Sequence, residues 1–162
     1  VRYIQLFDTK KNLSYFGNRG ISGIEGSTST ALGSASVHSK TNILITGDLS
    51  FIYDQNGLWN NHIPNNLKLF VFNNQGGGIF KIISGPKNTP FLEEYFETKH
   101  ELSLKSIAQT HHLNYHCAKN EKEAEQIIPS VLESNQFEIV EFFTGNVENE
   151  KILNDYFSVI KK

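Results

Sequence analysis

The stretches NILITGD (Asn42–Asp48) and KLFVFNN (Lys68–Asn74) decide the fold. Each is a short run of apolar, mostly β-branched or aromatic residues that stops at a polar side chain, which is typical of a buried strand. Strands that are buried on both faces belong to parallel sheets covered by helices. The two stretches therefore predict successive parallel strands, with Asp48 and Asn74 at their carboxyl ends.

Strand and helix patterns alternate along the rest of the chain. We expect further strands at Ser14–Phe16, Asn114–Cys117 and Phe137–Phe143. We expect helices at Arg2–Phe7, Glu25–His38, Ser50–Leu58, Leu102–His112, Lys122–Glu133 and Ile152–Ile160, and a loop rich in Gly and Pro from Gly76 to about Pro90. This order predicts a doubly wound α/β fold, with a mostly parallel sheet and helices on both faces. Such folds bind ligands beyond the carboxyl ends of their strands.

The composition excludes several classes of protein. The 162 residues suit a single domain, and 17 acidic against 15 basic side chains give no signal for nucleic acid. No apolar run approaches the roughly 18 residues of a membrane span, so we expect no integral membrane contact. The single cysteine, Cys117, excludes an internal disulfide framework and fits a reducing compartment, so we expect a cytoplasmic location. Because the sequence contains no methionine, even at position 1, we expect a part of a longer protein.

The polar residues at the two strand ends have structural explanations as well as functional ones. Asp48 and Ser50 could cap a helix, and Asn73-Asn74 could form a turn. The glycines Gly76–Gly78 could make a flexible loop, or they could let the backbone approach a ligand closely. Free amides at a helix start also bind phosphate.

Together, the two strand ends offer the ligands of a hard cation. Magnesium prefers oxygen ligands in near-octahedral geometry, with substrate phosphates and water completing the shell. The Asp48 carboxylate, the Asn74 side-chain oxygen and the Gly76 carbonyl would supply three such ligands. The pair of strand ends therefore predicts a magnesium and phosphate site.

Two further features need explanation. The turn at Asn18–Thr30 is rich in glycine but lacks the G-x-G-x-x-G spacing of a dinucleotide site. Its Arg19 could bind a carboxylate through two hydrogen bonds. The histidines near Cys117 fit a solvated helix end better than a zinc site, whose ligands must converge from separate segments.

These motifs resemble a known family. Gly47-Asp48 followed by Asn73-Asn74 resembles the thiamin-diphosphate signature of the decarboxylase and synthase superfamily. YFGNRGISGIEG (Tyr15–Gly26), with Glu25 in place of the usual Asp, resembles the 2-succinyl-5-enolpyruvyl-6-hydroxy-3-cyclohexene-1-carboxylate synthases of menaquinone biosynthesis. Gly47–Asp54 and Asn73–Phe80 follow the same family. The resemblance covers nearly the whole chain and implies only the C-terminal diphosphate-binding domain, with the thiamin-diphosphate-binding fold, over residues 1–162.

The resemblance also implies residue roles. The cofactors would be thiamin diphosphate and Mg²⁺ (or Mn²⁺), with the metal held by Asp48, Asn74 and Gly76. The other cofactor-binding residues would be Gly23, Ile24, Gly47, Leu49 and Ser50, with Ile24 under the thiazolium. The substrate-binding residues would be Arg2, Arg19, Ile79, Phe80 and Ile83.

The implied reaction decarboxylates 2-oxoglutarate and adds the resulting succinyl semialdehyde carbanion to isochorismate. The catalytic glutamate of this family comes from the pyrimidine-binding domain of a partner subunit in a homodimer or tetramer. No catalytic residue is therefore expected in this chain, and the chain alone should be inactive. Two alternatives stay open. One is another thiamin-diphosphate enzyme, such as an acetolactate synthase or a 2-oxo acid decarboxylase, and the other is a non-catalytic diphosphate-binding module.

Overall fold

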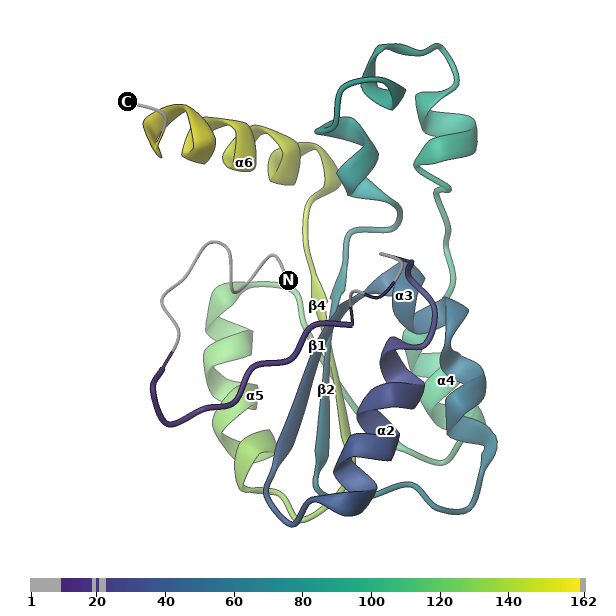
Figure 1. Cartoon of the computed structure of the whole chain (residues 1–162), viewed down its shortest axis with the longest axis vertical. Helices are drawn as coiled ribbons and strands as arrows, with labels where there is room; N and C mark the ends of the chain where they lie inside the picture. The colour runs from purple at the N-terminus through teal and green to yellow at the C-terminus, as the bar shows by residue number, and fades with distance from the viewer. Residues whose placement is uncertain (1–9, 19, 21–22, 161–162) are drawn as a thin grey trace.

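The computed structural model describes residues 10–18, 20 and 23–160 of the chain. Its sheet has four strands, which are β1 (Asn42–Gly47), β2 (Leu67–Asn73), β3 (Asn114–Ala118) and β4 (Glu138–Phe143). The spatial order is β1-β2-β4-β3, and every neighbouring pair is parallel. The carboxyl ends of all the strands therefore lie at one edge of the sheet (Figure 1).

Helices cover both faces of this sheet. On one face lie α2 (Ser27–Val37), α3 (Asp48–Tyr53) and α4 (Leu104–Thr110), and on the other lies α5 (Glu121–Glu133) (Figure 1). The last helix, α6 (Asn146–Ile160), lies beyond the carboxyl edge. This arrangement confirms the predicted doubly wound α/β fold with a parallel sheet.

The alternation of side chains along the strands makes two apolar cores. On the α2 side, Leu69 and Val71 of β2 pack with Phe51, Leu104 and Ile139. On the α5 side, the core consists of Phe70, Ala118, Ala124, Ile127, Ile128, Val131, Val140 and Phe142. Because β2 lies between two neighbours and contributes to both cores, it needs apolar residues at nearly every position.

The edge strand β1 is covered on only one face. Leu44 packs into the core on the α2 side, whereas Ile43 and Ile45 are 50% and 44% exposed. The run in the sequence suggests burial on both faces, but in the structure every second side chain of β1 faces outward.

Two predicted elements differ from the structure, and a third cannot be compared with it. Ser14–Phe16 forms no strand. The predicted helix Ser50–Leu58 is instead α3 followed by a 3-10 turn, η1 (Gln55–Trp59). The break falls at Asp54, whose backbone leaves the helical conformation (φ −112°, ψ 17°) and whose carboxylate accepts hydrogen bonds from Ser29. The predicted helix Arg2–Phe7 lies outside the described residues.

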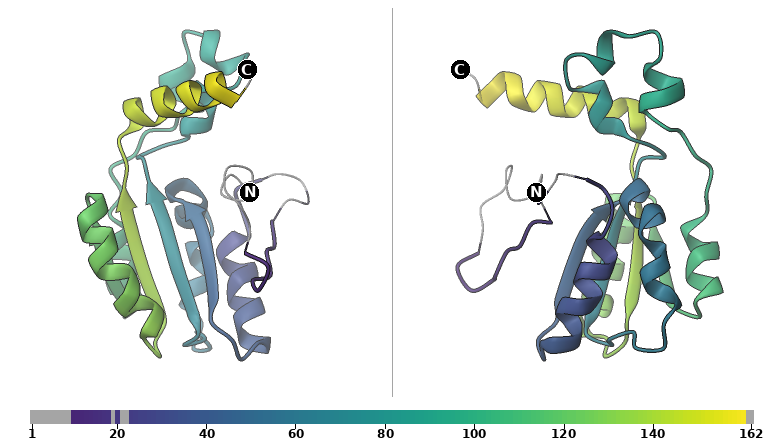
Figure 2. Two further views of the ribbon diagram at one scale, coloured as in Figure 1. Left: turned by 90° about the vertical axis from the view of Figure 1, so that its left-hand side faces the viewer. Right: turned by 45° about the vertical axis from the view of Figure 1, so that its right-hand side comes forward.

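The segment predicted as a loop carries short helical turns. They are η2 (Gly78–Lys81), η3 (Pro86–Asn88) and, beyond the predicted loop, the π-helical turn η4 (Leu92–Phe96). Together with α6, these turns form a cap beyond the carboxyl ends of the strands (Figure 2). An ion pair of 2.8 Å between Lys87 and Glu150 joins η3 to α6. Within the described part of the chain, no helix is long and apolar enough to cross a membrane.

Candidate functional site

Asp48 and Gly76 meet at the carboxyl ends of β1 and β2. Asp48 is only 2% exposed. Its Oδ2 accepts a hydrogen bond of 3.0 Å from the Gly76 amide, and its Oδ1 accepts one of 2.8 Å from the Leu49 amide. Two of the three predicted metal ligands are therefore in direct contact, although they are 28 positions apart.

The two asparagines after β2 have different environments. Asn73 is 2% exposed, and its side chain bonds Glu141 and the Gln75 amide. Asn74 is half-buried and makes no side-chain hydrogen bond to another described residue. Its amide oxygen is therefore available for a ligand, which fits the prediction that Asn74, and not Asn73, holds a metal.

His100 was not predicted, yet it contacts the predicted metal ligand Asp48. Its Nε2 lies 3.1 Å from Asp48 Oδ2. The Leu102 amide donates to His100 Nδ1 across 3.2 Å, so Nδ1 is an acceptor and Nε2 carries the proton. The imidazole therefore donates to the carboxylate. No motif around His100 indicates this contact, because it is made between segments 52 positions apart.

The turn before α2 is fastened to α3. The Ser50 hydroxyl donates to the Ile24 carbonyl at 2.6 Å, which joins two predicted cofactor-binding residues. A few residues on, Asp54 accepts two hydrogen bonds of 2.7 Å, from the amide and the hydroxyl of Ser29. Gly23, next to Ile24, and Gly47, at the end of β1, lie in the same region, so the predicted cofactor-binding residues come from adjoining segments.

The predicted apolar wall lies in the cap. Ile79 and Phe80 belong to η2, and Ile83 follows two residues after it. The ring centroids of Phe80 and Phe96 are 5.7 Å apart, whereas Ile79 and Ile83 are 49% and 42% exposed. Arg2 and Arg19, the predicted substrate-binding arginines, lie outside the described residues, and their roles stay predictions.

Close packing explains the glycine at position 76. A Cβ atom there would lie 2.8 Å from the carbonyl oxygen of Glu97, which also accepts a 2.6 Å bond from the Gly77 amide. The buried Glu97 side chain pairs with Lys81 at 2.9 Å. The backbone at Gly76 is therefore held between Asp48 on one side and Glu97 on the other.

The chemistry of these donors suits Mg²⁺. A carboxylate, an amide oxygen and a backbone carbonyl are hard oxygen ligands. The Gly76 carbonyl accepts one bond, of 3.0 Å from the Gly78 amide, and a carbonyl has two lone pairs. The residues of the predicted site thus fit a magnesium ion. No group of three or more His, Cys, Asp or Glu side chains in the described ranges could form a different metal site.

A second cluster lies behind the predicted site, at the ends of β2, β3 and β4. Glu141 is buried there and accepts hydrogen bonds from Asn73 and from the hydroxyl of Tyr115. Burial, and next the bond to Glu141, raises the pKa of Tyr115 above its usual range. A cavity of about 700 Å³ opens beside these residues and Cys117. In the sequence, the signal for this cluster is Glu141, a charged residue inside the apolar run of β4.

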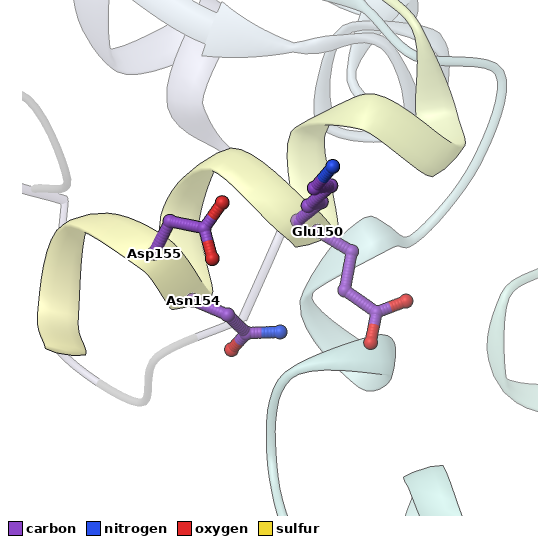
Figure 3. Close-up of a pocket in the computed structure, with 4 residues that line it drawn as sticks. Glu150, Asn154 and Asp155 are labelled. Atoms are coloured by element: carbon purple, nitrogen blue, oxygen red, sulfur yellow. The ribbon is translucent and has the colours of Figure 1, made fainter.

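Another hollow, of about 390 Å³, runs along α6 and is lined by Glu150, Lys151, Asn154 and Asp155 (Figure 3). All four residues belong to one helix, and none is a predicted site residue. The hollow therefore has no part in the candidate site.

Comparisons with known proteins bear on the family of the chain. The family described as "Thiamine pyrophosphate enzyme, C-terminal TPP binding domain" matches residues 2–142. A 2-succinyl-5-enolpyruvyl-6-hydroxy-3-cyclohexene-1-carboxylate synthase of Christiangramia forsetii is 45% identical, over 99% of this chain and 28% of that protein. A synthase of the same name from Porphyromonas gingivalis is 41% identical, over 99% of this chain and 28% of that protein. The chain thus spans less than a third of the length of these relatives.

A solved structure shows the same fold. The crystal structure of benzoylformate decarboxylase from Polynucleobacter necessarius superposes with a TM-score of 0.58, covering 72% of this chain and 22% of that chain. At 17% sequence identity, this likeness concerns the fold alone. The family match and the shared fold lead to one conclusion: the chain belongs to the thiamine pyrophosphate enzymes, as their C-terminal TPP-binding domain.

Proposed function

We propose that this chain is the diphosphate- and metal-binding domain of a synthase that decarboxylates 2-oxoglutarate and joins the remaining four-carbon unit to isochorismate. The observation that carries the proposal is the contact of 3.0 Å between Asp48 and Gly76, which brings the ends of β1 and β2 to one point. The synthase relatives named above, 41% to 45% identical, support the choice of reaction.

In this proposal, Asp48, Asn74 and Gly76 hold Mg²⁺, and the backbone amides of Leu49 and Ser50 donate to the diphosphate. The Leu49 amide would exchange its bond to Asp48 Oδ1 for one to the diphosphate, whereas the Ser50 hydroxyl stays with the Ile24 carbonyl. When it is bound, thiamin diphosphate supplies the carbanion chemistry of the decarboxylation. The residues of this chain fix the diphosphate end and, through Ile24, support the ring. Arg2 and Arg19 take the carboxylates of the substrates, and Ile79, Phe80 and Ile83 keep water away from the reacting groups.

The proposal assigns the catalytic glutamate to a pyrimidine-binding domain that this chain does not contain. That domain would belong to a partner subunit, so the enzyme would be a homodimer or a tetramer. The reducing compartment suggested by the single cysteine would be the cytoplasm. This chain alone would bind the diphosphate but catalyse no turnover.

Calorimetric titration of the full-length protein with thiamin diphosphate and MgCl₂ tests the cofactor assignment. We expect saturable, magnesium-dependent binding that Asp48→Asn abolishes. The control is Asp155→Asn, which changes an exposed aspartate of α6 and should leave binding intact. Equal affinity of the wild type and Asp48→Asn would refute the ligand assignment.

A substrate assay of the same protein tests the reaction. Carbon dioxide release from 2-oxoglutarate, coupled to the loss of isochorismate, is expected. Turnover of pyruvate alone would favour an acetolactate synthase or a decarboxylase. Cofactor binding without any turnover of these oxo acids would favour a non-catalytic module.

A further inference from the structure

Glu141 is a buried carboxylate that faces the back of the loop carrying two of the proposed metal ligands. We call residues 73–78 the cofactor loop. Glu141 lies on β4 and is 2% exposed. Its Oε1 accepts a bond of 2.5 Å from Asn73 Nδ2, and its Oε2 accepts a bond from the Tyr115 hydroxyl. Neutral donors therefore hold both oxygens, and the proposed function assigns no role to this residue.

Among the described residues, Glu141 bonds only one member of the cofactor loop, which is Asn73. The side-chain nitrogen, the side-chain oxygen and the backbone carbonyl of Asn73 each make a hydrogen bond within the protein. Its side-chain nitrogen donates to Glu141, and its side-chain oxygen accepts from the Gln75 amide at 2.9 Å. Its backbone carbonyl accepts from the Thr144 amide at 2.9 Å. Asn73 therefore anchors the start of the loop to β4.

The bond from Gln75 to Asn73 sets the path of the cofactor loop. It closes an Asx turn, and Gln75 adopts a φ of 61°, which few residues other than glycine and asparagine favour. The next amide, that of Gly76, then points at Asp48 Oδ2. Asn74 lies between the two anchored residues. A continuous chain of hydrogen bonds thus runs from Glu141 through Asn73 to the backbone that carries Asn74 and Gly76.

We infer that Glu141 is a positioning residue for the magnesium and the diphosphate, and that it acts through Asn73. This inference rests on the proposed function, because it concerns the same metal site. Residues that hydrogen-bond metal ligands from behind commonly change metal affinity 10- to 100-fold when they are replaced. Glu141 acts through one further residue, Asn73, and fixes the backbone of the cofactor loop as well as a side chain.

The carboxylate accepts from two donors, and its charge strengthens both bonds. In Glu141→Gln, the amide oxygen can still accept from Asn73 Nδ2, and the amide nitrogen then faces the Tyr115 hydroxyl, which has to turn and accept instead of donate. The bond to Asn73 is kept in this arrangement but loses the strength that the charge of the carboxylate gave it. If Asn73 turned its side chain over to accept from the new amide, it would lose the bond to Gln75. The substitution keeps the volume of the side chain, so its effect comes from the charge and the direction of the hydrogen bonds.

The reciprocal substitution offers a rescue. In Asn73→Asp alone, two carboxylates would face each other at 2.5 Å, which is strongly unfavourable. In the double variant, the new carboxylate at position 73 accepts from the new amide at position 141 and still accepts from Gln75. Tyr115 then donates to the remaining oxygen at position 141, so the whole chain of bonds is restored in the reverse direction.

The experiment compares these variants in the full-length protein, with thiamin diphosphate and MgCl₂ titrated by calorimetry. We expect Asn73→Asp to raise the Kd about 10- to 100-fold, Glu141→Gln to raise it less, and the double variant to recover most of the loss seen in Asn73→Asp. At saturating cofactor, the KM for 2-oxoglutarate should stay unchanged, which a general loss of structure would not allow. The matched control is Glu138→Gln, because Glu138 is also buried on β4 but bonds His116 and Ser134 at the opposite end of the sheet.

The outcomes separate this inference from the proposed function. If the wild type binds no thiamin diphosphate, the proposed function is wrong. If the wild type binds and Asn73→Asp binds equally well, the positioning role of Glu141 is overturned. A Kd raised as much in Glu138→Gln as in Glu141→Gln would also overturn it. If Glu141→Gln folds poorly, the double variant still tests the inference. Failure of the double variant to recover the cofactor affinity lost in Asn73→Asp would contradict the proposed exchange of hydrogen-bond donor and acceptor.

Discussion

The imidazole of His100 donates from Nε2 to Asp48 Oδ2 across 3.1 Å and joins the segment after the cap to the end of β1. His100 itself is held by the Leu102 amide, which donates to Nδ1. The proposed metal ligand Asp48 therefore receives one bond from the cofactor loop and one from a residue that lies far beyond it in the sequence. The orientation of its carboxylate depends on both.

Replacing His100 should weaken the metal site. In His100→Ala, Asp48 keeps the hydrogen bonds from the Leu49 and Gly76 amides. It loses the hydrogen bond that the imidazole donates to Oδ2. We expect magnesium-dependent affinity for thiamin diphosphate to fall about 10-fold, at the lower end of the range for such partners. Calorimetry of the full-length protein measures it, with the exposed His62→Ala as control. Unchanged affinity would mean that His100 does not orient the carboxylate.

Adding a methyl group at position 76 should disturb the same site from the backbone. In Gly76→Ala, the Cβ would lie 2.8 Å from the Glu97 carbonyl oxygen, so the loop has to move away from η4. We expect overpacking to cost about 1–3 kcal/mol and the cofactor affinity to fall with it. Hydrogen exchange of the β2 amides reports the stability in the full-length protein. Gly33→Ala in α2, where nothing lies within 4 Å, is the control and should stabilise the helix.

Asp54 should contribute to stability more than to chemistry. Its carboxylate accepts two bonds of 2.7 Å from Ser29 and so ties the start of α2 to the end of α3. Asp54→Ala leaves the Ser29 amide without its partner, and bonds to charged groups contribute about 1.5–3 kcal/mol. We expect the amide hydrogens of α2 to exchange with solvent faster, by the factor that this loss of free energy implies. Asp155→Ala, on the exposed side of α6, should change nothing, and equal exchange in both variants would contradict the role of Asp54.

Tyr115 should make the domain sensitive to alkali. Burial, and next the bond to Glu141, raises the pKa of Tyr115 in the folded state above the unfolded value of about 10. The folded state therefore holds its proton more tightly, and this stabilisation is complete below pH 10 and is lost as the pH rises beyond that value. Thermal unfolding at pH 8 and pH 11 should show a smaller alkaline loss in Tyr115→Phe than in the wild type. An equal loss in both proteins would contradict the shift.

The sequence predicted the elements that local patterns determine. The runs that became β1 and β2 were identified, and so was the convergence of Asp48 with Gly76, because parallel strands end at a common edge. Contacts made across long separations were not predictable. Glu141 bonds Asn73 from 68 positions away, and nothing near either residue specifies the partner.

The errors in the predicted elements have physical causes. The segment after Asp48 has a continuous helical pattern, but the side chain of Asp54 bonds Ser29 and the segment tightens into η1. The glycines and prolines of the cap suggest an irregular loop. In the structure, the buried Glu97 organises them, because its carbonyl accepts from Gly77 and its side chain pairs with Lys81. Tertiary contacts overrode local preference in both places.

The attachment of Asn73 to β4 has a consequence for the kinetics of the cofactor. A flexible glycine loop would have to become ordered each time it closes on a diphosphate, and the lost conformational entropy would oppose binding. In this protein the sheet orders the start of the loop during folding, through the bonds of Asn73 to Glu141 and Thr144. Movement of the start of the loop would have to break these bonds. Escape of a bound cofactor by opening of the whole loop would therefore be slowed by the need to break these bonds.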